Sequence, residues 1–60
     1  MLKAAFVFLA PNADPRIHRS VIETEAVHLI TIGVDSYASA VAEVAKIKDE
    51  GVETVELCGG

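Results

Sequence analysis

The sequence predicts a small α/β protein in which three parallel strands form one sheet and two helices connect them. Three short apolar runs, typical of strands, are separated by two stretches that carry helix start and stop signals. Strands that are joined through helices run parallel, so we expect the order strand, helix, strand, helix, strand. The chain is long enough for one domain at most, covering residues 1–60.

The first predicted strand, residues 2–9, is the centre of the expected sheet. Seven of its eight residues are apolar, and a run of this length that is rich in Phe and Val suits a strand buried on both faces. Prolines at positions 11 and 15, with Asn12 and Asp14 between them, end the run too early for a buried helix. We therefore place a strand here.

Residues 14–23 are predicted to form the first helix. Asp14 is a preferred N-cap residue, and Pro15 suits the first helical position, where its missing N–H is no loss. Apolar residues at 17, 21 and 22 fall on one helix face, with His18 beside them. A helix of fewer than three turns is marginal without packing, so its apolar face has to lie against the sheet.

Two further strands are expected at residues 27–34 and 53–58. The first of them is rich in β-branched residues, is apolar on both faces, and has Gly33 near its end, where another backbone can approach closely. The second alternates, with Val55 and Leu57 on one face and polar residues on the other. An alternating strand lies at a sheet edge, or one of its faces lines a polar site or an interface.

The second predicted helix covers residues 37–50. Asp35 or Ser36 caps its start, and Gly51 followed by an apolar residue is a typical helix end, with glycine in the left-handed conformation. Its apolar face is expected to contain Tyr37, Val41, Val44, Ala45, the Lys48 stem and Val52, flanked by Ala40 and Ile47, and its polar face Ser39, Glu43, Lys46, Asp49 and Glu50.

Strand order 2-1-3, with one helix on each sheet face, is the expected topology, and order 3-2-1, with both helices on one face, is the alternative. The preferred order corresponds to half of a Rossmann-like or flavodoxin-like fold. In either arrangement, three strands and two helices leave apolar sheet surface uncovered. A chain this short buries only roughly 60% of its unfolded surface. We therefore expect it to form a homo-oligomer or to be part of a longer protein.

Composition excludes several classes of function. The formal charge is −4 and no basic stripe is present, which argues against a nucleic-acid partner. No apolar stretch is long enough to span a membrane. The single cysteine rules out an internal disulfide, and together with the lack of a signal peptide it favours a cytoplasmic location. Two separated histidines and one cysteine give no metal-ligand spacing, and we expect no metal and no cofactor.

Several segments resemble a family of short prokaryotic α/β proteins of unknown function. The segments are residues 3–11, 13–15, 18–19, 21–24 and the closing Val-Glu-Leu-Cys-Gly-Gly of residues 55–60. The resemblance covers nearly the whole chain. It implies a small α/β fold of about a hundred residues, in which a further helix and strand follow the double glycine, so the chain is expected to lack its C-terminal third. It implies no activity.

A candidate site lies where the expected parallel strands end, because ligands of open sheets bind beyond the carboxyl ends of the strands. Cys58 is the candidate nucleophile, with His18 nearby to assist its ionisation, and the amides of Gly59 and Gly60 could hold an oxyanion. Asn12, Asp14 and the two glycines are the candidates to bind a small anionic ligand. The plainer interpretation makes Cys58 a small buried residue, His18 a packed or loop-bonded residue and Asp14 only a helix cap.

Two hypotheses about function follow. In the first, the chain is a non-enzymatic cytoplasmic module that works through self-association or an interaction surface on its uncovered sheet. In the second, it is a small-molecule enzyme or an anion-binding domain with its site at the ends of strands 1 and 3. The sequence identifies neither a reaction nor a substrate.

Overall fold

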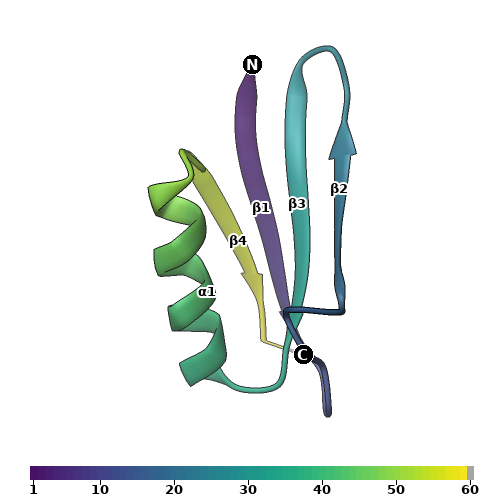
Figure 1. Ribbon diagram of the computed structural model, residues 1–60, viewed down its shortest axis with the longest axis vertical. Helices are drawn as coiled ribbons and strands as arrows, with labels where there is room; N and C mark the ends of the chain where they lie inside the picture. The colour runs from purple at the N-terminus through teal and green to yellow at the C-terminus, as the bar shows by residue number, and fades with distance from the viewer. Residues whose placement is uncertain (60) are drawn as a thin grey trace.

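The computed structural model describes residues 1–59 and contains a four-stranded sheet with one helix (Figure 1). The strands lie in the order β2-β3-β1-β4. In this sheet β1 is parallel to both β3 and β4, whereas β2 is antiparallel to β3. The elements in chain order are β1 (Leu2–Leu9), β2 (Arg19–Glu23), β3 (Val27–Val34), α1 (Tyr37–Asp49) and β4 (Thr54–Cys58).

The α/β class and the arrangement of the three parallel strands are confirmed. The strands predicted at residues 2–9, 27–34 and 53–58 correspond to β1, β3 and β4. They lie side by side with β1 in the middle, which is the predicted order 2-1-3. The alternating last strand lies at a sheet edge, as expected. The apolar run of residues 2–9 is therefore the strand on which both parallel partners pair.

The helix predicted at residues 14–23 is wrong. Asp14 starts a single turn, in which its carbonyl accepts hydrogen bonds from the N–H groups of Ile17 and His18. The chain then leaves the turn, and residues 19–23 form β2, which pairs with β3 in the antiparallel sense. A helix of fewer than three turns has little stability of its own, while the β-branched pair Val21 and Ile22 suits a strand. Pairing with β3 therefore decides the structure of this segment.

This extra strand explains how β1 and β3 come to be parallel without a helix between them. Parallel neighbours require the chain to return to the starting end of the sheet, a task usually performed by a crossover helix. Here β2 makes the return, and a tight turn leads directly into β3. In that turn the Thr24 hydroxyl accepts hydrogen bonds from the N–H groups of Ala26 and Val27 at 3.2 and 2.9 Å. The only crossover helix within residues 1–59 is α1, between β3 and β4.

With one helix in the described chain, one face of the sheet is covered and the opposite face is not. The prediction of a helix on each face, with β1 and β3 buried on both faces, is therefore wrong. The helix-covered face holds the core, and along β1 its buried residues Ala5 and Val7 flank the exposed Phe6, whereas β3 is buried or half-buried throughout. Buried core residues are Ala5, Val7, Ile30, Ile32 and Val34 from the strands, with Ala40, Ile47 and Val52 from the helix and the segment after it.

We call the uncovered side of the sheet the open face. Strand alternation and the pairing register place on it the residues whose side chains point away from α1. They are Leu2, Ala4, Phe6 and Phe8 of β1; Val27, Leu29, Thr31 and Gly33 of β3; Ser20 and Ile22 of β2; and Thr54, Glu56 and Cys58 of β4. Its centre is apolar, and its polar residues lie mainly on the two edge strands.

The second helix forms nearly as predicted, and Val44 packs against the core as expected, but the buried face is rotated from the predicted one. The Ser36 side chain caps its start by accepting a hydrogen bond from the Ser39 N–H at 3.1 Å, and Gly51 follows its end with a φ of 95°. The buried helix residues are Ala40, Glu43 and Ile47, whereas Tyr37 and Val41, expected on the buried face, are exposed. The carboxylate of Glu43 is buried, and Arg19 of β2 and Lys46 of α1 pair with it and offset the cost of burying its charge.

Candidate functional site

The predicted site region, at the carboxyl ends of β1, β3 and β4, is formed mainly by the loop of residues 10–18. This loop leaves β1, passes the end of β3 and enters β2, and Figure 1 shows it at the lower end of the sheet. The Ala10 N–H donates to the Val34 carbonyl at 2.9 Å, which joins the loop to β3. Asn12 holds a left-handed conformation with a φ of 65°, which asparagine tolerates better than most residues. Asn12 is thus a turn residue.

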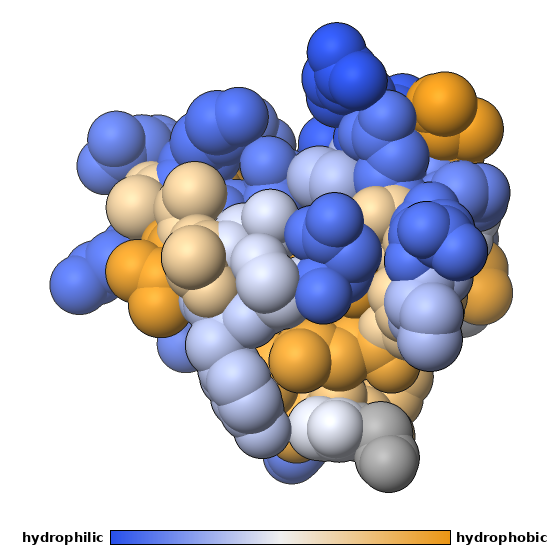
Figure 2. Space-filling model, turned by 90° about the horizontal axis from the view of Figure 1, so that it is seen from below, coloured by the Kyte–Doolittle hydropathy of each residue, from blue (hydrophilic) through white to orange (hydrophobic). Residues whose placement is uncertain are grey.

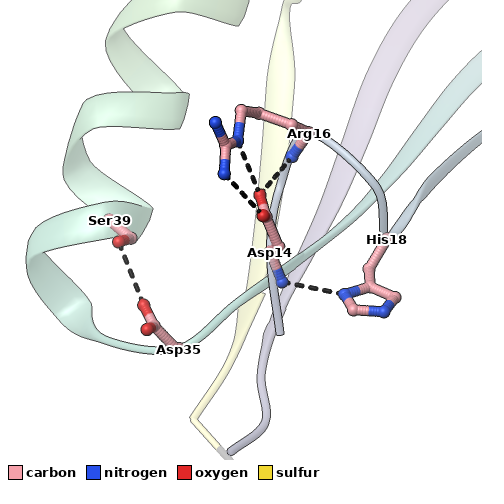
Figure 3. A network of polar contacts seen from close by, with 5 residues as sticks. All are labelled: Asp14, Arg16, His18, Asp35 and Ser39. Atoms are coloured by element: carbon pink, nitrogen blue, oxygen red, sulfur yellow. Dashed lines mark hydrogen bonds and ion pairs between the residues drawn. The ribbon is translucent and has the colours of Figure 1, made fainter. Parts of the chain in front are cut away.

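Asp14 organises the loop rather than capping a helix. Its carboxylate accepts from the Arg16 backbone N–H at 2.9 Å and forms a two-point ion pair with the Arg16 guanidinium, at 3.1 Å from Nε and 2.9 Å from Nη2 (Figure 3). These hydrogen bonds from Arg16 lower the pKa of Asp14 from 3.8 to about 2. The carboxylate and its one neighbouring cation are therefore already paired with each other, on an exposed surface.

His18 is held at the other end of the same loop. Its Nδ1 accepts the Asp14 backbone N–H at 2.8 Å (Figure 3), so in the neutral ring the proton is on Nε2. The His18 carbonyl accepts from the Gly33 N–H at 2.7 Å. A Cβ added at Gly33 would lie 2.8 Å from Cζ of Phe8 and 3.3 Å from Cβ of His18. The hydrogen bond to the His18 carbonyl is the close backbone approach predicted for Gly33, and the side-chain contacts place the Phe8 ring beside His18.

Cys58 and His18 lie in the same row of the sheet but are not neighbours. Phe8 pairs with Gly33 on one side and with Cys58 on the other, and Gly33 in turn meets His18. Three strand spacings of about 4.8 Å therefore separate the two backbones, roughly 14 Å in all. The structure does not bring the thiol and the imidazole together as a pair. Cys58 is an exposed free cysteine on the open face, so the plainer interpretation of a buried residue is wrong.

The two glycines can be followed only in part. Gly59 is exposed and lies close to α1, since an added Cβ would be 2.8 Å from the Tyr37 hydroxyl. Gly60 lies outside the described residues, so the structure does not test the oxyanion role predicted for its amide. The predicted roles of these glycines, and of Cys58 as a nucleophile, stay predictions.

Four hollows border the loop, and two of them border the open face. One that does not, of ≈ 420 Å³, is lined by Leu9, Ala10, Pro11, Asp35 and Gly59. On the open face, one hollow, of ≈ 310 Å³, is lined by Phe8, Ile17, His18, Arg19, Ser20 and Thr31. The second, of ≈ 380 Å³, is lined by Phe8, Ala10, Pro11, Asn12, Ala13 and His18. Both share Phe8 and His18, so the loop forms a wall along the carboxyl end of the open face. Figure 2, which views the molecule from this end, shows hydrophobic surface between hydrophilic groups.

The fourth hollow, of ≈ 490 Å³, lies between the loop and the start of α1 and is polar. Its ionisable lining residues are Asp14, Arg16, Asp35, Glu43 and Lys46. Three carboxylates thus face two cations, and both cations already pair with carboxylates. The Ser39 hydroxyl donates to Asp35 at 3.2 Å (Figure 3). The arrangement gives little support to binding of an anion, which stays a prediction.

Two features of this region could not be located from sequence reasoning. Phe8 belongs to the strand that was expected to be buried on both faces, yet it lines both open-face hollows. Glu43 was assigned to the polar helix face, yet it is buried and meets Arg19 at 3.7 Å and Lys46 at 3.3 Å. The only available signal was the spacing of Glu43 and Lys46, three residues apart on one helix.

Other kinds of site find no support in the described part of the chain. Among residues 1–59, no three His, Cys, Asp or Glu side chains lie where they could hold a metal ion together. The described chain also contains no helix that is both long enough and apolar enough to cross a membrane.

Comparison with known proteins identifies the family. The family model described as "Family of unknown function (DUF6506)" matches residues 2–60, and the chain therefore belongs to that family. This confirms the resemblance to a family of unknown function. Neither the search of curated proteins nor that of solved structures found a match.

Proposed function

We propose that this member of the DUF6506 family is a non-enzymatic interaction module whose working surface is the open face of its sheet. One observation carries the proposal. Along β1, Ala5 and Val7 are 2% and 0% exposed under the helix, whereas Phe6 between them is 38% exposed on the other side. An aromatic residue at the centre of a sheet face that nothing in the described chain covers is a typical feature of a binding surface.

The composition of the open face supports this proposal. Its apolar residues are contiguous over the two central strands, and Leu2 and Ile22 are 41% and 55% exposed. Among the strand residues on this face, Glu56 is the one that carries a charge, and it lies on the edge strand β4. An apolar centre with a polar rim is the usual anatomy of a protein interface.

The size of the face fits a small interface. Four strands spaced about 4.8 Å apart, with about 3.3 Å per residue along the strands, give a projected area of roughly 400 Å². That is about a tenth of the chain's surface of 3949 Å². Stable complexes commonly bury about 800 Å² per partner, so we expect reversible association rather than a permanent complex.

Self-association is the first form of interaction to test, by light scattering on a size-exclusion column over a range of concentrations. Phe6→Lys should shift the mass toward that of one chain, because a lysine at the centre of the face would be buried in the interface. Val41→Lys is the matched control, since Val41 is 69% exposed on the outer side of α1. Circular dichroism should show that both variants keep the wild-type secondary structure. Equal masses for the two variants would contradict self-association through the open face.

We also propose a cytoplasmic location, which rests on the single free cysteine and on the mildly acidic charge. Fractionation of cells that express the tagged protein at native level tests it. Recovery of most of the protein outside the cytoplasmic fraction would reject it.

A further inference from the structure

We infer that the two hollows around Phe8 form a binding site for a small uncharged aromatic amide. We call these two hollows, which share Phe8 and His18, the Phe8 groove. Three features carry the inference: a hydrogen-bond donor that the loop holds in place, two hydroxyl groups beside it, and apolar walls without a free charge. The inference goes beyond the proposed function and does not depend on it, because it concerns a small molecule and not a protein surface.

His18 supplies the hydrogen-bond donor of the groove. Its Nδ1 accepts the Asp14 backbone N–H at 2.8 Å, so in the neutral ring the proton is on Nε2 (Figure 3). The His18 carbonyl accepts from the Gly33 N–H at 2.7 Å, which joins this residue to β3. Two hydrogen bonds thus fix the tautomer and the backbone position, and they leave Nε2–H as a donor. A ligand in the groove has to present an acceptor to it, such as a carbonyl oxygen.

Ser20 and Thr31 supply two hydroxyl groups to the same groove. The two residues pair directly between β2 and β3, and both line the hollow of ≈ 310 Å³. Within residues 1–59, the hydrogen bonds of side-chain hydroxyls involve Thr24, Ser36 and Ser39, so those of Ser20 and Thr31 are available. A hydroxyl both accepts and donates, and this pair can therefore bind an N–H that lies next to the carbonyl. A carbonyl beside an N–H is an amide.

Phe8 and Ile17 supply the apolar walls. The Phe8 ring is held in place on two sides: it lies against Gly33, where an added Cβ would be 2.8 Å from its Cζ, and it stacks with Phe6 at 6.4 Å between centroids. Ile17 lines the same hollow and is 70% exposed. A flat ring that packs on Phe8 would also cover Ile17, and aromatic pairs are more stable than the buried area alone predicts.

The charges around the groove favour an uncharged ligand. Among the described residues that line the groove, Arg19 is the one with a permanent charge. Its guanidinium lies on the other side of the sheet, where it pairs with the buried Glu43 at 3.7 Å. The groove therefore offers no free cation to a carboxylate and no carboxylate to an amine, and an unpaired charge is costly to bury. The ligand class differs in this respect from the anion predicted from the sequence.

The size of the groove fits a ligand with a single ring. Its hollows of ≈ 310 and ≈ 380 Å³ lie at the lower end of the range of about 300–1,000 Å³ that small-molecule sites span. A single-ring amide has few atoms with which to bind, so we expect a Kd of about 1–10 mM.

Three probes of similar size test the ligand class in titrations followed by amide NMR: benzamide, benzoate and cyclohexanecarboxamide. Benzoate keeps the aromatic ring and carries a charge, whereas cyclohexanecarboxamide keeps the amide and lacks the flat ring. Benzamide should shift the amide signals of Phe8, His18 and Thr31 and bind with the Kd given above. The two other probes should bind at least about fivefold more weakly.

His18→Asn separates ligand binding from the structure of the loop. The asparagine side-chain oxygen can accept the Asp14 N–H in place of Nδ1, but no atom replaces Nε2–H. The Kd for benzamide should therefore rise about five- to tenfold, while the amide signals of residues 14–17 stay in place. Val41→Ala, on the outer side of α1, is the matched control and should leave the Kd unchanged.

Phe8→Leu provides a second variant that does not alter the hydrogen bonds of the loop. It removes the aromatic wall, and the Kd for benzamide should rise at least about threefold. A preference for benzamide over both other probes, weakened in His18→Asn and in Phe8→Leu, supports the site.

Three results would overturn the inference. Equal or tighter binding of benzoate excludes an uncharged ligand, and equal binding of cyclohexanecarboxamide excludes the aromatic contact. Absence of benzamide binding at tenfold above the expected Kd, or a Kd that changes in neither variant, excludes the site itself. The mass of Phe6→Lys, which tests the proposed function, is measured without any of these probes, so either idea can fail without the other.

Discussion

Gly33→Ala is expected to destabilise the protein through the Phe8 ring. The added methyl group would lie 2.8 Å from Cζ and 3.1 Å from Cε2 of that ring, and 3.3 Å from the Cβ of His18. Each distance is shorter than an ordinary carbon contact of about 3.5 Å. The ring therefore has to move, or the β3 backbone has to shift away from the loop.

Two opposing effects set the size of the change in unfolding free energy. Replacing glycine by alanine in a strand with ordinary backbone angles stabilises by about 0.5–1 kcal/mol, because the unfolded chain loses freedom. Forcing an extra methyl group into a filled site costs about 1–3 kcal/mol. The net expectation is a loss of about 1–2 kcal/mol. In a Phe8→Leu background the ring atoms Cζ and Cε2 are gone, so Gly33→Ala should become neutral or slightly stabilising.

Urea unfolding, followed by circular dichroism, measures the four corners of this double-mutant cycle. All four proteins are compared at one concentration, because association would shift apparent stability. We expect a coupling energy of about 2 kcal/mol between the two positions. If Gly33→Ala costs the same with Phe8 and with Leu at position 8, within about 0.5 kcal/mol, the close packing of the ring on Gly33 is refuted.

Three further predictions concern the loop, the thiol and the helix. Measured by NMR, the Asp14 carboxyl should titrate with a pKa of about 2, and Arg16→Gln should raise this pKa toward 3.8. Because the pKa of the folded state is lower than that of the unfolded state, the stability that this pair contributes is present above about pH 4 and is lost as the pH falls toward 2. An unchanged pKa in the variant would exclude Arg16 as its cause. Iodoacetamide should alkylate Cys58 in His18→Ala at a rate within about twofold of the wild-type rate, because Phe8 and Gly33 lie between Cys58 and His18 in the row. A reaction that is tenfold slower in the variant would support a thiol–imidazole pair. Ser36→Ala removes the hydrogen bond that caps α1 and should cost about 1 kcal/mol in urea unfolding, whereas no loss would show that the cap is dispensable.

The sequence was sufficient for the parallel strands because their signals are local. The apolar run of β1, the β-branched run of β3 and the alternation in β4 each indicate a strand without reference to the rest of the chain. The same holds for α1, whose start at Ser36 and end before Gly51 carry side-chain and glycine signals. The central place of β1 between β3 and β4 followed from the order of these runs along the chain.

The segment of residues 14–23 could not be assigned in this way because two local signals disagree. Asp14 and Pro15 favour a helix start, and the structure does form one turn there. Val21 and Ile22 favour a strand, and the outcome depends on the free edge of β3, a partner that local patterns do not reveal. The wrong helix carried a second error with it, since it implied a covered face where the sheet is open.

For the candidate site, the sequence located the region but not the contacts. It placed Asn12, Asp14 and His18 together at the carboxyl end of the sheet, and the structure joins Asp14 and His18 by a hydrogen bond. It could not place Cys58 relative to His18, because the distance between them across the sheet depends on how many strands separate them. That number changed when β2 joined the sheet as an edge strand beside β3.

The most direct test of the open face as the working surface is a dilution series followed by methyl NMR. Methyl groups of Leu2, Ile22 and Leu29 on the open face should shift as the protein is diluted from about 1 mM, because they leave an interface. The methyl groups of Val41, which is more exposed to solvent on the helix, should not shift. Shifts confined to Val41 and its neighbours would place the interface on the helix, and a spectrum that does not change with concentration would contradict self-association through the open face.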